Sequence, residues 1–255
     1  MDTPSNSIRQ QPAIASGTGD FLAAHNINKS LTSGDKPLQI LQTINLQFSA
    51  GSTNAIVGAS GSGKTTLLGL LAGLDLPTSG EIIFEGQDIS RLDEDQRAML
   101  RAGKVAFIFQ SFQLLQHLTA YENVLLSLEI LNRSDARDRA LSTLERVGLG
   151  ERLHHYPNQL SGGEQQRCAI ARAFAIDPIL LFADEPTGNL DLKTGTRIID
   201  LLFEMNREKQ TCLVIATHDM ALAKKCDRTI ELSGGEVIAD SFGQKQDPSS
   251  LHSSG

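Results

Sequence analysis

The stretch GASGSGKT at residues 58–65 constrains the fold of this chain more than any other part of the sequence. It matches the pattern GxxxxGK[ST], follows the apolar run TNAIV and opens the leucine-rich segment KTTLLGLLAGL. A glycine loop between a strand and a helix is the context that a phosphate-binding P-loop requires. Its backbone N–H groups and the N-terminus of its helix attract phosphate oxygens, which a Cβ would keep at a distance. The pattern therefore predicts a nucleoside triphosphate site lined by Gly58, Ala59, Ser60, Gly61, Ser62, Gly63, Lys64, Thr65 and Thr66.

Two neighbouring carboxylates supply further chemistry that a P-loop needs. Asp184 and Glu185 end the apolar run ILLFADE, which predicts a buried strand. A P-loop site holds Mg²⁺ with a loop hydroxyl and an acid on a neighbouring strand, so we expect Thr65 and Asp184 to be metal ligands. Lys64 is expected to reach the β- and γ-phosphates, and Glu185 to orient and partly deprotonate the attacking water. The alternative for this acid pair is a solvated strand end.

Two polar residues stand at the ends of other strand-like runs. Gln110 ends KVAFIFQ, and His218 ends TCLVIATH. In a parallel sheet, ligands bind beside the carboxyl ends of the strands. We therefore expect the Gln110 amide to contact the nucleotide, Mg²⁺ or water, and His218 to act in catalysis by hydrogen-bonding the γ-phosphate and the water. The alternatives are a plain strand-end glutamine and an exposed or structural histidine.

Strand-like and helical segments alternate along most of the chain, which predicts an α/β fold with a mainly parallel sheet flanked by helices. The range 111–159 differs and is mainly helical. Within it, SDARDRALSTLERVGLG predicts a helix with Ser134 as its N-cap and with Gly148 and Gly150 at its end. The residues that share the apolar face of this helix are Ala140, Leu141, Leu144 and Val147.

These patterns divide the chain into a nucleotide-binding core at 21–110 and 160–240, a helical subdomain at 111–159, and mobile polar tails at 1–20 and 241–255. The first tail lacks the apolar block of a signal peptide. No apolar run approaches the about 20 residues of a membrane span, so we expect any membrane link to come from a partner. The net charge of −7 argues against nucleic acid as a partner. The cysteines lie too far apart for a zinc site and predict free thiols in a reducing cytosol; they are Cys168, Cys212 and Cys226.

The pentapeptide LSGGE occurs twice, at residues 160–164 and 232–236, in different surroundings. The first copy places Ser161, Gly162 and Gly163 at the start of the helical segment EQQRCAIARAFA, where free N–H groups and the positive end of a helix bind anions. The second copy lies between the strand-like runs RTIEL and EVIAD, which predicts a hairpin turn at its glycines. We therefore expect a phosphate contact from the first copy and a structural turn from the second.

Together these motifs resemble the ATP-binding subunits of ABC transporters over residues 21–240. GASGSGKT, the Q-loop FQSF, the signature LSGGEQQR, ILLFADEP, the D-loop GNLD and the switch motif THD occur in the order typical of that family. The resemblance implies a P-loop ABC ATPase core with an N-terminal antiparallel β portion plus a helical subdomain, and ATP and Mg²⁺ as cofactors. It also implies the Walker B role for Asp184, the catalytic role for Glu185, a D-loop role at the nucleotide for Asp191 and the switch role for His218.

The resemblance further implies a homodimer with composite ATP sites. A γ-phosphate held by both the P-loop and residues 160–164 requires two chains facing head to tail, each closing the nucleotide of the other. The segment HHYPNQLSGGE lacks the TxVGExG element of fused exporters, which favours a separate subunit docked on a membrane permease. That subunit would be peripheral, at the cytoplasmic side of the inner membrane. The residues expected near the groove for the permease are Phe112, Thr119, Tyr121, Glu122 and Asn123, although Phe112 and Tyr121 could equally serve packing.

Within the family, GLDLPTSGEI, LRAGKVAFIFQSF and LFADEPTGNLD most resemble the lipoprotein-release and macrolide-export group, and in particular its branch of predicted export ATPases. This likeness implies export, or extraction of a lipoprotein or hydrophobic substrate. One departure is Leu31, which stands about where many relatives stack a tyrosine on adenine. The alternatives are a soluble ABC ATPase acting on ribosomes or DNA, a cell-division regulator that drives cell-wall hydrolases, and a small-molecule kinase.

Overall fold

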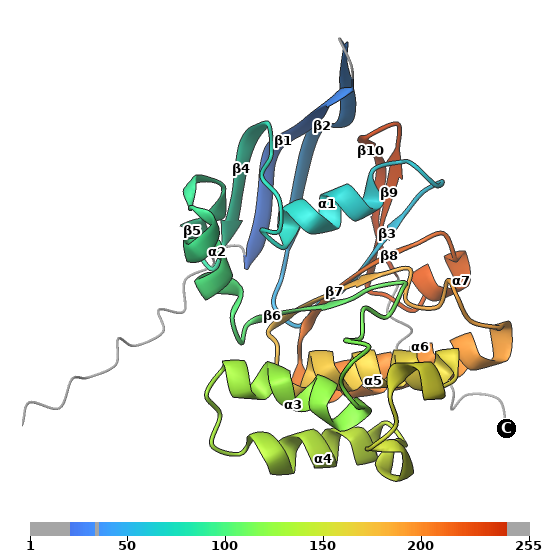
Figure 1. Cartoon of the computed structure of the whole chain (residues 1–255). Coiled ribbons are helices and arrows are strands. Elements are labelled where there is room, and N and C mark those ends of the chain that lie inside the picture. The colour runs from blue at the N-terminus through green and yellow to red at the C-terminus, as the bar shows by residue number, and fades with distance from the viewer. Residues whose placement is uncertain (1–20, 34–35, 244–255) are drawn as a thin grey trace, which may run out of the picture.

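The computed structural model describes residues 21–33 and 36–243, and Figure 1 shows that they form two sheets with helices packed around them. The larger sheet has the strand order β10-β9-β3-β8-β7-β6 and the smaller one the order β2-β1-β4-β5. The strands of the larger sheet are β3 (Thr53–Val57), β6 (Val105–Ile108), β7 (Leu180–Asp184), β8 (Cys212–Thr217), β9 (Arg228–Ser233) and β10 (Glu236–Phe242). Those of the smaller sheet are β1 (Leu22–Ser33), β2 (Lys36–Phe48), β4 (Ser79–Phe84) and β5 (Gln87–Asp88).

Strand direction distinguishes the two sheets. In the larger sheet the neighbours from β9 to β6 run parallel, and β10 returns antiparallel to β9. In the smaller sheet every pair is antiparallel. The predicted fold class is thereby confirmed, including the antiparallel portion near the N-terminus. Because the parallel strands share one direction, the carboxyl ends of β3, β7 and β8 lie together at one edge of the sheet.

The central strands β7 and β8 are buried on both faces, which explains their continuous apolar sequence. Successive side chains point to opposite faces, so Leu180 and Phe182 enter one core while Leu181 and Ala183 enter the other. The first core lies between the two sheets and includes the leucines of α1 (Lys64–Leu71), which Figure 1 shows in that position. The second core joins the opposite face of the larger sheet to the helical layer.

That helical layer consists of α3 (Ala120–Ile130), α4 (Ala136–Arg146), α5 (Gly162–Ala175), α6 (Leu192–Lys209) and the short α7 (Met220–Ala223). The remaining helices are α2 (Glu94–Arg101) and 3₁₀ turns at Ile89–Arg91, Gly150–Arg152 and Pro157–Gln159. Helices α3 and α4 come from the segment predicted as a helical subdomain, and they share one apolar core with α5. The motifs carried by α5 are therefore mechanically joined to that segment.

Helix α4 has the predicted apolar face, but its N-cap differs from the prediction. Asp135, rather than Ser134, occupies the N-cap position, and no side chain caps this helix end. The reason lies in Arg133, whose guanidinium donates to both carboxylate oxygens of Asp135 at 2.9 and 3.0 Å. The predicted end is correct, since Gly148 has a φ of 73°, a conformation that glycine adopts without strain. On the apolar face Ala140, Leu144 and Val147 are buried and Leu141 is half-buried.

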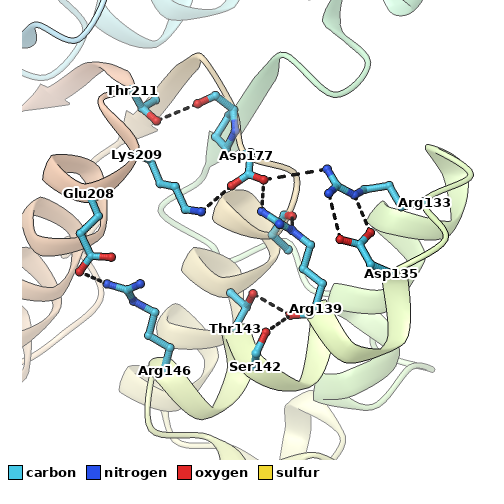
Figure 2. A network of polar contacts seen from close by, with 12 residues as sticks. Arg133, Asp135, Arg139, Ser142, Thr143, Arg146, Asp177, Glu208, Lys209 and Thr211 are labelled. Atoms are coloured by element: carbon cyan, nitrogen blue, oxygen red, sulfur yellow. Dashed lines mark hydrogen bonds and ion pairs between the residues drawn. The ribbon is translucent and has the colours of Figure 1, made fainter.

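A polar network ties α4 to the ends of α5 and α6 (Figure 2). Asp177, just after α5, forms an ion pair with Lys209 at 2.7 Å and another with Arg139 of α4, while Arg133 lies 3.9 Å away. Burial raises the pKa of Asp177, but the hydrogen bonds from Lys209 and Arg139 outweigh this effect and keep it below its ordinary value. Ion pairs from two helices therefore meet at one carboxylate, which joins α4 to α6.

The second copy of LSGGE forms the predicted hairpin. Strand β9 ends at Ser233 and β10 begins at Glu236, with φ values of 56° and 83° at Gly234 and Gly235. Strand β10 continues to Phe242, two residues into the predicted C-terminal tail, while 244–255 and the predicted tail at 1–20 lie outside the described residues. All three cysteines are buried free thiols, as predicted. Within the described part of the chain, no helix has the length and apolar character needed to cross a bilayer.

Candidate active site

The P-loop and three strand ends enclose a cavity of about 730 Å³. It lies at the carboxyl edge of the larger sheet, where β3, β7 and β8 end. The lining residues are Ile40, Ser60, Gly61, Gly63, Lys64, Thr65, Thr66, Gln110, Asp184, Glu185 and His218. Apart from Ile40, all of these are residues that the sequence predicted for the site. The fold therefore brings together segments that are up to 178 positions apart, from Ile40 to His218.

The P-loop keeps its shape because two of its glycines allow atoms of other segments to pack closely against its backbone. A Cβ on Gly58 would lie 2.2 Å from the carbonyl oxygen of Leu232, and one on Gly63 would lie 2.8 Å from Cδ2 of Leu41. Leu232 belongs to the second LSGGE copy, so that hairpin supports the P-loop from behind. Ser62 is buried in the loop, and its backbone N–H donates to Ala59 at 3.2 Å.

The ammonium group of Lys64 lies inside the loop. It donates to the carbonyl oxygens of Gly58 at 2.8 Å and Ala59 at 3.0 Å. This concentrates a positive charge where the loop N–H groups and the N-terminus of α1 also favour an anion. The geometry therefore fits a polyphosphate.

An all-oxygen donor set stands next to the P-loop. The hydroxyl of Thr65 donates to Asp184 Oδ2 at 2.7 Å. Burial is the main factor that raises the pKa of Asp184, and the neighbouring Glu185 raises it further, while Thr65 opposes them. In the described residues no three His, Cys, Asp or Glu side chains group to hold a metal ion. A hydroxyl, one carboxylate and an amide oxygen fit Mg²⁺, which prefers oxygen and completes its shell with water and phosphate.

Gln110 is anchored near this donor set through the segment after β7. Asn189 Nδ2 donates to the Gln110 carbonyl oxygen at 2.8 Å, and the Gln110 amide lies 3.5 Å from Asn189 Oδ1. A Cβ on Gly188 would come within 2.8 Å of Gln110 Nε2, so glycine is required for this close approach. The Gln110 side chain therefore lines the cavity from a position that the D-loop segment defines.

Glu185 and His218 face each other across the mouth of the cavity. His218 Nδ1 lies 2.9 Å from Glu185 Oε1, with the Glu185 side chain 16% exposed and the His218 side chain 72% exposed. Glu185 has a φ of 45°, and its N–H donates to Ala216 at 2.9 Å. A left-handed conformation costs a glutamate about 1 kcal/mol, and such strain is typical of functional sites. The turn directs the carboxylate into the cavity beside Asp184.

The first LSGGE copy lies at a second, separate cavity of about 310 Å³. Ser161 caps α5, and its N–H and hydroxyl both donate to Glu164 Oε2 at 2.8 Å. A Cβ on Gly163 would lie 2.6 Å from Thr194 Cγ2 of α6. The lining residues are Ser161, Gly162, Gly163, Arg167, Asn189, Leu190, Asp191, Thr194, Arg197 and Ile198. The predicted residues Ser161, Gly162, Gly163 and Asp191 thus lie together but do not line the P-loop cavity of their own chain.

The sequence motifs did not identify two arginines that line this second cavity. Arg167 follows Gly163 by four residues, and Arg197 follows Thr194 by three, so each lies on the same helix face as a lining residue. Helical periodicity applied to the start of α5 and α6 could have found them. Asp191 itself is the N-cap of α6 and accepts from the N–H of Thr194 at 3.1 Å. The cavity therefore combines a helix N-terminus with two guanidinium groups, which suits an anion.

We expect the capping carboxylate Glu164 to make stability depend on acid pH. The N–H of Ser161, then its hydroxyl and Arg152, lower the pKa of Glu164 to about 2. A lowered pKa means that this stabilisation is complete above about pH 4.5 and is lost as the pH falls toward 2. Urea unfolding should show that Glu164→Gln removes about 2 kcal/mol of this pH dependence.

The matched control is Glu236→Gln, in the second pentapeptide copy, where the glutamate is exposed and begins a strand instead of a helix. Its unfolding free energy should follow the wild-type curve between pH 5 and pH 2. A Glu164→Gln curve parallel to the wild type would contradict the capping interaction.

Comparison with known proteins agrees with this geometry. A protein-family model described as ABC transporter matches residues 41–188. The ABC transporter ATP-binding protein YbbA of Escherichia coli K12 is 51% identical over 220 residues, which cover 86% of this chain and 96% of YbbA. The lipoprotein-releasing system ATP-binding protein LolD of Pseudomonas syringae pv. tomato is 46% identical over 219 residues, which cover 85% of this chain and 96% of LolD. The dimeric ATP-binding cassette MJ0796, solved in a post-hydrolysis state with ADP and Pi, matches with a TM-score of 0.81 and 40% identity, over 87% of this chain and 98% of the cassette.

Proposed function

Because the chain belongs to the ABC transporter family and is an ATP-binding, ATP-hydrolysing subunit of a transporter, we propose that it works as a head-to-tail homodimer that drives a separate membrane permease. The observation that carries this proposal is the separation of the two anion-binding cavities on one chain. Ser161 and its glycines line one cavity, while Lys64 and Glu185 line the other. A γ-phosphate that contacts the residues of both cavities requires a second copy of the chain. The relative MJ0796 is itself described as dimeric.

In the proposed reaction, ATP binds with its phosphates in the P-loop, and the N–H groups and Lys64 hold the β- and γ-phosphates. Thr65, Asp184 and the amide oxygen of Gln110 would hold Mg²⁺, which neutralises charge on the β- and γ-phosphate oxygens when bound. Glu185 orients the attacking water and accepts its proton. His218, held against Glu185 through Nδ1, hydrogen-bonds the γ-phosphate with its other ring nitrogen.

The adenine base meets an aliphatic surface in this proposal. Ile40 lines the P-loop cavity, and Leu31 is 49% exposed on the same two-stranded part of the smaller sheet. Two aliphatic side chains can bury one face of a purine but offer it no hydrogen bonds. We therefore propose that phosphate contacts dominate affinity, with a weak preference between ATP and GTP.

The permease is proposed to dock on the segment after Gln110. In this segment Leu115 is 49% exposed and Phe112 is partly buried against the helical core. Thr119 and Glu122 form the capping box of α3, and Tyr121 packs against the helical core. Asn123 does not face a partner: it is buried, and its amide contacts the backbone oxygens of Leu115, Leu118 and Thr119 from below. Asn123 therefore shapes the docking segment and does not belong to its surface.

The proposed direction of transport and the proposed cargo are based on the names of similar proteins. The LolD proteins are named as ATP-binding proteins of a lipoprotein-releasing system. We propose by this likeness that the chain lies peripherally at the cytoplasmic side of the inner membrane and powers export or extraction of a lipoprotein or another hydrophobic substrate.

Affinity purification from detergent-solubilised membranes tests the permease proposal. We expect the tagged chain to retain a multispanning membrane protein, and Leu115→Glu to lose most of it while keeping basal ATPase activity. The control is Ile238→Glu, which adds the same charge at an apolar residue of β10 that is 57% exposed. Retention of the membrane protein by Leu115→Glu, or recovery of ribosomes or DNA in its place, would refute the proposed docking.

A further inference from the structure

We propose that Arg172 is a positioning residue that fixes the loop 110–113, here called the Gln110 loop, to helix α5. This inference rests on the proposed function and deepens it. In the proposed dimer, α5 presents Ser161 to one nucleotide and the Gln110 loop presents Gln110 to the other. Arg172 would link this helix to this loop. Arg172 would touch neither nucleotide and would act through Gln110.

The direct evidence is a pair of hydrogen bonds from one guanidinium to the loop backbone. Arg172 Nη1 donates to the carbonyl oxygen of Gln113 at 2.7 Å, and Nη2 donates to that of Phe112 at 3.2 Å. The planar guanidinium thereby contacts two consecutive carbonyls, which the single ammonium group of a lysine cannot match.

The loop backbone needs such support. Phe112 and Gln113 have φ values of 60° and 46°, so two consecutive non-glycine residues adopt the left-handed conformation. This conformation is unfavourable for L-residues and persists only where surrounding contacts enforce it. The turn is tight, since the Gln113 N–H donates to Ser111 at 2.6 Å. The two carbonyls that follow these strained φ angles are the ones that Arg172 binds.

The surroundings of Arg172 favour this role over that of an ordinary ion pair. The side chain is half-buried, and in the described part of the chain no carboxylate lies within ion-pair distance of it. Burying a guanidinium without a countercharge is costly unless its donors are satisfied, and here the two loop carbonyls accept from it. Removal of the guanidinium would therefore loosen the loop at Phe112 and Gln113 without breaking an ion pair.

The same loop also touches the other end of α5. A Cβ on Gly162 would lie 3.8 Å from Cζ of Phe112, so the aromatic ring reaches the start of the helix. Arg172 lies ten residues further along, about 15 Å of helix, and its side chain points back toward the N-terminus. The Gln110 loop is thus attached to α5 at two places. A movement of α5 that accompanies phosphate binding at Ser161 would carry the loop with it.

Hydrogen exchange by mass spectrometry tests the attachment directly on the full chain. In Arg172→Met the amides of residues 110–115 should exchange about tenfold faster than in the wild type, because the strained loop opens more often. Arg172→Lys should give an intermediate rate. The control Arg146→Met removes an arginine of α4 that pairs with Glu208 and does not contact the loop, so it should exchange there like the wild type.

Steady-state kinetics test the consequence for catalysis. We expect kcat to fall roughly tenfold in Arg172→Met with the KM for ATP changed less than about twofold, because the P-loop contacts remain. Wild-type exchange at 110–115 in Arg172→Met would overturn the inference, and so would faster exchange with an unchanged kcat. If Arg172→Met melts far below Arg146→Met, the same criteria apply to Arg172→Lys, which keeps a cation at this position. Failure of the proposed function is distinguishable, because the wild-type chain would then form no dimer in ATP or retain no membrane protein, whereas the exchange difference between Arg172→Met and Arg146→Met requires neither.

Discussion

Replacement of Glu185 by glutamine is expected to lower the kcat for ATP hydrolysis by roughly 10²- to 10⁴-fold while ATP still binds. The carboxylate lies at the cavity mouth, 2.9 Å from His218 Nδ1, and the amide of glutamine cannot accept a proton from water. The P-loop contacts of Lys64 and Thr65 do not involve Glu185, so affinity should persist. ATP bound without turnover should then hold two chains together.

Phosphate release and size-exclusion chromatography with ATP measure the two effects. Glu185→Gln should elute as a dimer in ATP and as a monomer without nucleotide. Asp200→Asn is the matched control, since this acid pairs with Lys225 on the surface and lines neither cavity. It should hydrolyse ATP like the wild type. If Glu185→Gln hydrolysed ATP at the wild-type rate, another residue would be the base.

The second large effect comes from a matched pair of substitutions in the two LSGGE copies. Ser161→Arg should reduce hydrolysis to below about one hundredth of the wild-type rate, because it removes an anion-binding hydroxyl and fills the cavity at the start of α5. Ser233→Arg should retain most of the activity, since Ser233 is exposed at the end of β9. The same residue type is changed in the same pentapeptide, so only the surroundings differ.

Thermal unfolding of the same two variants should be measured beside their ATP hydrolysis. Loss of the Ser161 cap should cost about 1 kcal/mol, which leaves the protein folded at room temperature. A large loss of hydrolysis with a small shift in Tm would then report on the site and not on stability. Equal losses of hydrolysis in Ser161→Arg and Ser233→Arg would contradict the different roles assigned to the two copies.

Local patterns predicted the elements that carry the site. The P-loop, the strands that lead to Asp184 and His218, and the hairpin at Gly234 each depend on residues adjacent in the chain, because turn geometry and strand periodicity are local properties. The start of α4 was wrong by one residue. There an ion pair between Arg133 and Asp135 decided the conformation, and helix-cap preferences do not include such a pair.

Contacts between distant segments could not be predicted from the sequence. Nothing in the residues around position 232 indicates that Leu232 supports Gly58, and a list of polar residues near Tyr121 does not reveal that Asn123 is buried beneath its own loop. The same holds for Arg172, whose role depends on two carbonyls about 60 positions away. Backbone carbonyls carry no sequence signal, so their partners emerge only when the chain is folded.

By itself, the sequence determined the chemistry of this protein: a phosphate loop, an acid pair and a helix N-terminus that carries a serine and two glycines. Each of these is a short-range arrangement that a few consecutive residues specify. The tertiary structure alone decided how these groups are distributed. It placed Glu185 and His218 in the P-loop cavity and Ser161 in another, because helix α5 packs against the opposite face of the sheet from α1. That separation is what makes a second copy of the chain necessary for the proposed reaction.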